Sequence, residues 1–339
     1  MSGAPAKRLR VYLSHAPDAF ANYYGDEALA ALQEAAEVRR NAGDRDLSGR
    51  ALAEAAKGCE LIVSYRLSHA PAELFEHAPY LVAFLRCAVD IRDVDLGAAN
   101  AQGVLVTQAT PGFIPAVAEL VLGQMVDLGR GVSAATERFH RGEQPEARMG
   151  RQLAGSTLGV IGYGAIGRRL AAMALALDMR VMVSDPKARA DDPRIVQVEL
   201  PELLSAADFV VCLAVANAET ENLMDAAAFA RMKPGAFFLN PSRGNLVDEA
   251  ALRAALDSGR LAGAALDVGR APDQMPSPEL AAHPRVVATP HVGGLTPPAT
   301  LHQAMDTVRQ VRALAAGRVP DGAVNAAAAH RLARIGIGA

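Results

Sequence analysis

Short apolar runs alternate with amphipathic segments along the first hundred residues. The runs Arg8–Leu13, Leu61–Tyr65 and Leu81–Arg86 have the length of strands, and the segments Asp26–Glu37 and Leu47–Ala56 have helical periodicity. Strands that alternate with helices in this way form a parallel sheet covered by helices. The pattern therefore predicts an α/β domain at the start of the chain.

A second alternating series follows later in the chain. Six apolar segments of strand length have helical segments between them, and Asp248 is a suitable N-cap for a helix over Glu249–Asp257. Such a series predicts one doubly wound domain. The six predicted strands are Leu158–Ile161, Arg180–Ser184, Phe209–Leu213, Ala236–Leu239, Gly263–Leu266 and Val286–Thr289.

The segments outside these series have different characters. Ala116–Leu128 is apolar on nearly every face, which predicts a helix buried between domains or subunits, whereas Arg141–Arg151 is polar and predicts a surface loop. The chain after Pro297 is too short for a domain. We expect its helix, over Thr300–Ala316, to pack on the first domain.

One string of five residues, Leu-Ser-His-Ala-Pro, occurs twice, at 13–17 and at 67–71. Each copy follows a predicted strand, so the two could be equivalent loops at one edge of a sheet. Five residues are too few to establish a repeat, and coincidence is the favoured interpretation.

Composition restricts the class of protein. The chain has 339 residues, 51% hydrophobic and 21% charged, with a net charge of −3, which indicates a globular protein without a nucleic-acid or membrane-surface partner. The apolar stretch Val11–Leu13 is too short for a signal peptide. The histidines lack metal-ligand spacing, so we expect no metal. Three dispersed cysteines suggest no disulfide framework and a reducing cytoplasm: Cys59, Cys87 and Cys212.

The most informative motif is Leu158-Gly-Val-Ile-Gly-Tyr-Gly-Ala-Ile-Gly, a strand followed by GxGxxG and a helix. Gly162 permits a tight turn, Gly164 lets the backbone approach a pyrophosphate, and Gly167 lets the helix pack closely on the strand. A glycine-rich turn without a ligand is the alternative, but the flanking strand and helix favour a dinucleotide site.

An acidic residue supports this interpretation. Asp185 follows the next predicted strand, where a carboxylate accepts hydrogen bonds from a ribose diol and disfavours a 2′-phosphate. The alternative is that Asp185 only caps the turn before Pro186. The motif thus predicts NAD rather than NADP, although Lys187 and Arg189 weaken the exclusion of NADP.

Three further polar residues follow predicted strands: Arg243, Asp267 and His291. Ligands of doubly wound sheets bind at the carboxyl ends of strands. An arginine can hold a carboxylate with two hydrogen bonds, and a histidine can exchange a proton near neutral pH. Each alone could be a surface residue, but together they predict a hydride-transfer site.

At these residues the sequence resembles the D-isomer-specific 2-hydroxyacid dehydrogenases, including glyoxylate/hydroxypyruvate reductases and phosphoglycerate dehydrogenases. The matching segments are the glycine motif, MKPGAFFLNPSRGNLVDEAALRAALDSGRLAGAALDV (232–268) and ATPHVGG (288–294). The resemblance implies two doubly wound parallel-sheet domains, with a Rossmann NAD-binding domain (109–296) inserted into a flavodoxin-like substrate domain (1–108 and 297–339). It also implies a homodimer, with the Ala116–Leu128 helix near the interface.

The resemblance further implies roles for individual residues. Arg243 would bind the substrate carboxylate, His291 would be the acid/base, and Asp267 would hold the nicotinamide carboxamide. Arg66 would face the substrate, with a plain surface arginine as an open alternative. The other implied positions are Ala165, Ile166, Asp185, Val215 and Gly293 for the dinucleotide, and Val89 and Asp90 for the substrate.

The sequence departs from the family pattern at three places. Asp90 stands at a glycine position of the substrate loop, where it would repel an anion unless Arg92 or Arg66 neutralises it, and Val215 replaces a proline. The family's histidine-orienting glutamate is missing, since position 272 is proline. Asp273 is the nearest carboxylate and is predicted to replace it, with Gln274 as the competing candidate.

We therefore predict an NAD-dependent oxidoreductase that interconverts a small 2-oxo acid and the D-2-hydroxy acid. Two alternatives stay open. A dinucleotide-sensing binding protein of the same fold is favoured by the missing glutamate and by Asp90, but opposed by Arg243 and His291. An enzyme of the same mechanism could act on an atypical substrate, as formate dehydrogenases do.

Overall fold

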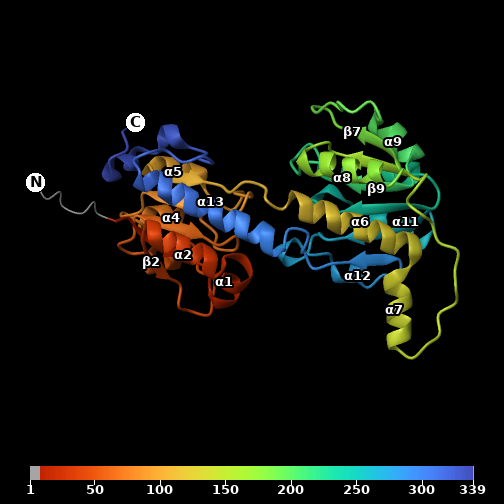
Figure 1. Cartoon of the computed structure of the whole chain (residues 1–339), viewed down its shortest axis with the longest axis horizontal. Coiled ribbons are helices and arrows are strands. Elements are labelled where there is room, and N and C mark those ends of the chain that lie inside the picture. The colour runs from red at the N-terminus through yellow and green to blue at the C-terminus, as the bar shows by residue number, and fades with distance from the viewer. Residues whose placement is uncertain (1–7, 339) are drawn as a thin grey trace, which may run out of the picture. The chain divides into compact units, whose positions relative to one another are not determined.

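The computed structural model describes residues 8–338, which divide into two compact units. The first is formed by the chain up to Phe113 and from Leu295 onward, and the second by Ile114–Gly294. In Figure 1 the first unit accordingly holds both ends of the colour scale, red and blue. The sequence predicted the changes of domain after residues 108 and 296; residues 1–7 and 339 of the predicted first domain lie outside the described residues.

The first unit is built on a five-stranded parallel sheet with the order β2-β1-β3-β4-β5. This is the flavodoxin-like order. Its strands are β1 (Arg10–Leu13), β2 (Glu37–Arg40), β3 (Leu61–Ser64), β4 (Ala83–Arg86) and β5 (Leu105–Thr107). Its α-helices are α1 (Pro17–Tyr23), α2 (Gly25–Ala35), α3 (Gly49–Ala55), α4 (Ala72–His77), α5 (Leu96–Gln102) and α13 (Pro297–Ala315).

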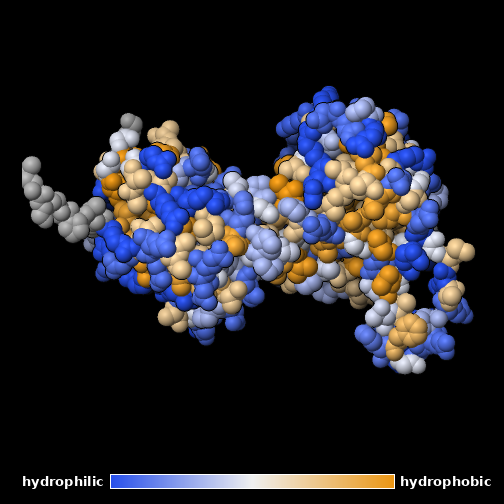
Figure 2. All heavy atoms as spheres, in the orientation of Figure 1, coloured by the Kyte–Doolittle hydropathy of each residue, from blue (hydrophilic) through white to orange (hydrophobic). Residues whose placement is uncertain are grey.

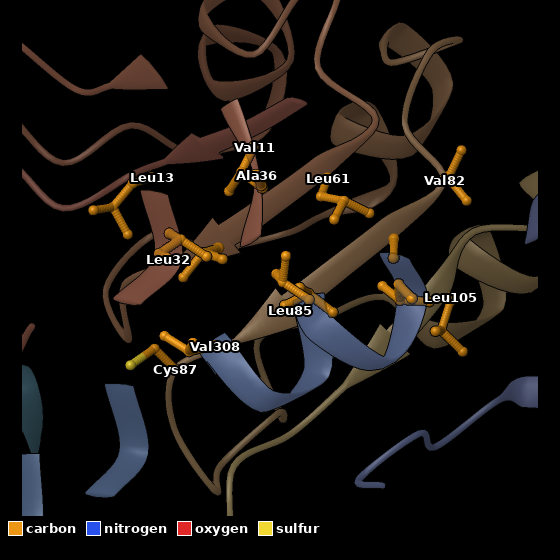
Figure 3. Packing of buried hydrophobic residues seen from close by; sticks show 14 of the residues in the cluster. Val11, Leu13, Leu32, Ala36, Leu61, Val82, Leu85, Cys87, Leu105 and Val308 are labelled. Atoms are coloured by element: carbon orange, nitrogen blue, oxygen red, sulfur yellow. The ribbon is translucent and has the colours of Figure 1, made fainter. Parts of the chain in front are cut away.

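The returning chain completes the core of the first unit. Val308, on α13, belongs to the same buried cluster as Leu32 of α2 and the strand residues Leu13 and Leu85 (Figure 3). Each is at most 1% exposed, and burial of such a side chain stabilises the fold by about 1.5–3 kcal/mol. The predicted packing of the C-terminal helix on the first domain is thus present.

Some elements of the first unit differ from the prediction. The predicted helix over Asp26–Glu37 ends at Ala35, and Glu37–Arg40 instead pairs with β1 as an edge strand. Three of the four side chains of this strand are exposed and charged, so the sequence has no apolar run that would predict a strand here. Charged side chains on an edge strand discourage pairing with another sheet. Helix α1, which starts at Pro17, was also not predicted.

The second unit contains a seven-stranded parallel sheet with the order β12-β11-β10-β9-β6-β7-β8. Six strands lie where the sequence predicted them. The seventh, β8, was missed because it is a short edge strand with Val196 exposed. The strands are β6 (Thr157–Ile161), β7 (Arg180–Ser184), β8 (Ile195–Gln197), β9 (Phe209–Cys212), β10 (Ala236–Asn240), β11 (Leu261–Leu266) and β12 (Val286–Ala288).

This unit has seven described α-helices, most of which cover the sheet, and the longest of them is the predicted apolar one. The N-cap predicted for α11 is present, since Asp248 Oδ1 accepts a hydrogen bond from the N–H of Ala251 at 3.1 Å. Between residues 8 and 338, no helix has both the length and the apolar character needed to cross a membrane. The helices are α6 (Ile114–Arg130), α7 (Val132–His140), α8 (Ala165–Ala176), α9 (Leu200–Ala206), α10 (Ala226–Arg231), α11 (Glu249–Asp257) and α12 (Pro278–Ala281).

Candidate active site

The glycine motif forms the turn from β6 into α8. Gly162 has φ +95°, and a Cβ on it would lie 2.6 Å from the main chain of Leu213. A Cβ on Gly167 would lie 2.5 Å from the carbonyl oxygen of Gly162, whereas Gly164 has nothing within 4 Å. Gly164 caps the helix that begins at Ala165. Backbone atoms therefore fill the space next to Gly162 and Gly167, whereas the space next to Gly164 is empty. An anion can bind there to the N–H groups at the start of the helix.

Asp185 lies beside this turn. Its Oδ2 accepts a hydrogen bond from Tyr163 N at 2.7 Å, and its Oδ1 accepts two, from Lys187 N at 2.8 Å and Ala188 N at 2.7 Å. Partial burial acts to raise the pKa of Asp185, but these three main-chain donors outweigh it and keep the pKa below its ordinary value. Asp185 is thus a fixed carboxylate next to the glycine motif.

The candidate residues of the second unit follow neighbouring strands of one sheet. Because all strands are parallel, their carboxyl ends share one edge. The strand order reverses at β6, which β9 and β7 flank, and such a reversal is where α/β sheets bind ligands. From β12 to β7, the residues met along this edge are His291, Asp267, Arg243, Val215, Gly162 and Asp185.

Arg243 occupies a turn that admits no side chain at the next position. It precedes a 3-10 turn over Gly244–Leu246, and its Nη1 donates to the carbonyl oxygen of Ser242 at 2.8 Å. A Cβ on Gly244 would overlap the main chain of Gly269. The backbone that carries the half-buried Arg243 side chain is therefore packed tightly on the loop that follows β11.

His291 lies in the loop after β12 and has φ +54°. Its Nδ1 is 2.8 Å from the main-chain carbonyl oxygen of Asp273. The structure thus brings Asp273 next to His291, but the recorded hydrogen bond involves the main chain, whereas the sequence suggested the carboxylate. A carbonyl oxygen can only accept, so Nδ1 carries the proton, and Nε2 is the nitrogen available to a substrate.

Asp267 is 2% exposed and holds the loop that carries His291. Its Oδ1 accepts from Thr289 Oγ1 at 2.6 Å and from Val292 N at 2.9 Å, and its Oδ2 accepts from Gly293 N at 2.8 Å. A Cβ on Gly293 would lie 2.8 Å from that Oδ2. About one acceptor position of the carboxylate is not used by these donors.

Sequence reasoning missed two residues in this network. Thr289 binds Asp267, and Gln124 of α6 donates to Thr289 Oγ1 at 3.3 Å. The position of Thr289 at the end of a strand was the signal available for it. Gln124 is a 4% exposed amide in a mostly apolar helix, and that contrast was its signal.

The other predicted dinucleotide positions are more exposed. Ala165 is exposed and Ile166 half-buried in the first turn of α8. Val215 follows β9 and is 77% exposed. No group of three or more His, Cys, Asp or Glu side chains that could hold a metal ion is present among residues 8–338.

In the first unit, the predicted substrate residues follow β3 and β4. The Arg66 guanidinium lies 5.3 Å from the centre of the Tyr23 ring. Asp90, next to the half-buried Val89, binds Arg92 through both carboxylate oxygens, at 3.0 Å to Nε and 2.6 Å to Nη2. The charge of Asp90 is thus neutralised by Arg92, one of the two residues proposed for this from the sequence.

Arg86 connects these loops and was also missed. It ends β4, is 2% exposed, and donates to the carbonyl oxygens of Tyr65 and Ser68 at 3.0 Å. It also donates to the carbonyl oxygen of Arg66 and to Asp93 Oδ2, the latter at 2.6 Å. A buried arginine that ends an apolar strand was the signal for this role.

The two Leu-Ser-His-Ala-Pro strings meet in the structure. Ser14 Oγ and Ser68 Oγ are 2.9 Å apart and buried, and Ser14 Oγ also accepts from Tyr65 N at 2.8 Å. Their histidines differ, since His69 is exposed whereas His15 is fully buried between the rings of Tyr24 and Tyr65. The strings thus form neighbouring but unequal loops at one sheet edge.

A doubly wound domain with this glycine turn, acidic partner and strand-end residues defines a dinucleotide-binding oxidoreductase fold. Residues 122–293, just over half of the chain, match the family model described as D-isomer specific 2-hydroxyacid dehydrogenase, NAD binding domain. The chain belongs to this family of NAD-dependent enzymes.

Several relatives cover most of the chain. The (S)-sulfolactate dehydrogenase of Chromohalobacter salexigens is 36% identical over 295 residues, which are 86% of this chain and 95% of that protein. The D-3-phosphoglycerate dehydrogenase of Haemophilus influenzae is 37% identical over 276 residues, 79% of this chain and 67% of that protein.

Solved structures agree in fold over nearly the whole chain. A D-isomer specific 2-hydroxyacid dehydrogenase from Polaromonas has a TM-score of 0.85 at 24% identity, covering 94% of this chain and all of that one. The D-lactate dehydrogenase of Aquifex aeolicus, solved with NAD and lactic acid, has a TM-score of 0.75 at 25% identity, covering 91% and 96%.

Proposed function

We propose that this protein interconverts a small 2-oxo acid and the corresponding D-2-hydroxy acid, using the strand-end residues of the second unit. The supporting observation is their order along one sheet edge, from His291 through Arg243 and the glycine turn to Asp185. An acid/base and an anion-binding group lie at one end, and a ribose-binding carboxylate lies at the other. This is the arrangement that an extended dinucleotide beside a small acid requires.

The roles follow from the chemistry of each group. Arg243 binds the substrate carboxylate with two hydrogen bonds and stabilises negative charge that develops on the C2 oxygen. During reduction, His291 gives the proton on Nε2 to that oxygen, and during oxidation it takes the proton back. Nδ1 stays bonded to the carbonyl oxygen of Asp273 throughout.

The residues at the sheet edge fit NAD. The open face at Gly164 suits a pyrophosphate, and Asp185 and Asp267 each have about one acceptor position left for a ribose hydroxyl and a carboxamide N–H. Val215, Ala165, Ile166 and Gly293 would contact the rest of the molecule. Bound NAD supplies a hydride to C2 or accepts one from it.

We assign the substrate loops to the first unit. Arg66 and the main chain near Val89 would face the acid, and Asp90 would be tolerated because Arg92 neutralises it. Arg86 keeps both loops in place by bonding to Arg66 and Asp93. These residues support the assignment of the first unit as the substrate domain.

The test is NADH oxidation, followed by absorbance, over a panel of 2-oxo acids. The panel should contain small, bulky apolar, phosphate-bearing and sulfonate-bearing acids, and should be repeated with NADPH. Turnover of at least one 2-oxo acid supports the proposal. Tight NADH binding without turnover of any acid would instead support a sensing protein, and NAD-dependent formate oxidation alone would support the atypical substrate.

Asp185 should determine the preference for NADH. We expect Asp185→Ser to weaken NADH binding about tenfold, because a hydrogen bond to a charged group is lost, and to narrow the gap to NADPH. Titration of both cofactors measures this. Asp192→Ser, in an exposed pair with Arg194, is the matched control. A wild-type preference for NADPH would contradict the placement of Asp185.

We also propose that the protein is a homodimer formed through α7. This nine-residue helix has no buried residue, and an isolated helix of that length is marginal in water. Figure 2 shows it standing off the second unit with hydrophobic and hydrophilic side chains side by side. Val132 is 52%, Phe139 61% and Met149 101% exposed, so a second copy is the partner that would cover them.

Light scattering tests the dimer. We expect the wild-type protein at twice the 35.4 kDa chain mass and the Phe139→Ser/Met149→Ser variant at the chain mass, because the apolar contacts are lost. Tyr80→Ser, which changes a 57% exposed side chain of the first unit, is the control. A variant that stays dimeric places the interface elsewhere.

Finally, we propose a reducing, cytoplasmic location. All three cysteines are buried and unpaired. Burial raises the pKa of both the Cys87 and the Cys212 thiol to about 12, so these two remain protonated and unreactive. Fractionation of cells that express the protein, with detection in the soluble cytoplasmic fraction, tests this location.

A further inference from the structure

Unusual backbone conformations gather at one contact in the second unit. Five non-glycine residues among those described have positive φ, and three of them are Asp273 (+55°), Gln274 (+57°) and His291 (+54°). Asp273 and His291 are the two partners of the 2.8 Å hydrogen bond. A left-handed conformation costs an L-residue roughly 1–2 kcal/mol. Such strain persists only where the surrounding structure enforces it, and it concentrates at functional sites.

The conformation of the loop around Asp273 is stabilised by hydrogen bonds within the loop. Gly269 N donates to the carbonyl oxygen of Gln274 at 2.8 Å, and Ala271 N donates to that of Met275 at 3.1 Å. A Cβ on Gly269 would lie 2.6 Å from Cα of Pro276. The loop is therefore closed at its base, and the carbonyl group of Asp273 cannot turn away without breaking these contacts.

The same loop contacts the backbone next to Arg243, the proposed substrate-binding residue. Gly244 follows Arg243 and packs so closely on the main chain of Gly269 that Gly244 admits no Cβ. The carbonyl oxygen on His291 and the turn that carries Arg243 are thus parts of one packed unit. A shift of the loop would move both.

We propose that the main-chain carbonyl of Asp273, presented by the left-handed pair Asp273-Gln274, is the group that orients His291 for proton transfer. The inference rests on the proposed function. The carbonyl oxygen accepts from Nδ1–H in both the neutral and the charged ring, so Nε2 is always the nitrogen that gains or loses the exchangeable proton. The carbonyl replaces the carboxylate that the family has at the position of Pro272. Asp273 is a positioning residue through its backbone.

This proposal separates the backbone of Asp273 from its side chain. Asparagine keeps the carbonyl and tolerates a positive φ, whereas valine keeps the carbonyl but resists that φ because it is β-branched. Charged side chains on the segments packed around the His291 loop include Asp267, which binds that loop, Asp273, and Arg243, whose turn packs on Gly269. Only Asp273→Asn changes one of these charges without straining the loop.

The first readout is kinetic. We expect Asp273→Asn to keep kcat within about threefold and to leave the pH dependence of reduction in place. Asp273→Val should lower kcat tenfold or more, with little change in the NADH dissociation constant. A fall in kcat of Asp273→Asn, or a shift of its alkaline limb to lower pH, would make the carboxylate the partner and overturn the proposal.

Gln274 provides a second comparison. Gln274→Gly removes the amide but suits the left-handed backbone, so we expect activity within about threefold of wild type. Gln274→Val should lower kcat about as much as Asp273→Val. Loss of activity in Gln274→Gly would show that the amide side chain orients the ring, which contradicts the proposal.

The second readout needs no turnover. Two-bond ¹H–¹⁵N spectra of the histidine-labelled protein in alkaline buffer should show His291 as the Nδ1–H tautomer, assigned by its loss in His291→Gln. Asp273→Val should change that tautomer population. An Nε2–H tautomer in the wild-type protein would overturn the proposal even if the enzyme is active. A correct tautomer without turnover of any 2-oxo acid would instead contradict the proposed function.

Discussion

Arg243→Lys is expected to lower kcat/KM for reduction at least ~100-fold, which corresponds to about 2.7 kcal/mol of lost transition-state stabilisation. Lysine keeps the positive charge but cannot form two parallel hydrogen bonds with a carboxylate. It also cannot reproduce the guanidinium that Nη1 anchors on the carbonyl oxygen of Ser242. The affinity for NADH should change little. Steady-state kinetics and an NADH titration measure the two effects.

A matched change elsewhere distinguishes this loss from a general effect of replacing arginine. Arg253 lies on α11 and pairs with Asp257 and Glu279 on the surface. Arg253→Lys should therefore keep full activity. Arg243→Ala should be less active than Arg243→Lys. A fully active Arg243→Ala variant would contradict the proposed mechanism.

The free energy of unfolding should fall by about 3 kcal/mol more between pH 6.5 and pH 4 in the wild-type protein than in a His15→Phe variant. His15 is fully buried, and neither ring nitrogen has a hydrogen-bond partner among the described residues. Burial, together with the charges of Arg86 and Arg40, lowers the pKa of His15 from 6.5 to about 3. The proton is thus bound by the unfolded chain well before it is bound by the folded one.

The sign of the effect follows from this difference. Above pH 6.5 neither state binds the proton, and stability does not depend on it. As the pH falls from 6.5 toward 3, only the unfolded state gains the proton, so the folded state loses stability. Phenylalanine keeps a ring between Tyr24 and Tyr65 but has no nitrogen to protonate.

Urea unfolding at several pH values measures this difference. At pH 7 His15→Phe should be more stable by ~1–3 kcal/mol, since two buried polar atoms without partners are removed. His77→Phe, at the exposed end of α4, is the control and should follow the wild-type pH dependence. Equal pH dependence of the wild type and His15→Phe would show that His15 has a partner in solution.

The sequence predicted most of the second unit because its strands are continuous apolar runs that end at polar residues. Arg243, Asp267 and His291 were selected as candidates by that position, and the structure places them after adjacent strands. Helix α7 and strands β2 and β8 were missed for a common reason. These three elements bury little apolar surface. The hydrophobic periodicity that predicts a helix or strand arises only where one face of the element is buried.

The sequence by itself determined the two α/β series, the glycine turn and the chemistry available at the strand ends, because these depend on residue type and local spacing. Only the tertiary structure decided which atom of Asp273 meets His291, that Ser14 meets Ser68, and that His15 is buried without a partner. Each of these depends on contacts between segments distant in sequence, such as the packing of Gly269 on Gly244. Such contacts determine the direction of a carbonyl group and the burial of a side chain, and neither can be inferred from the spacing of residues along the sequence.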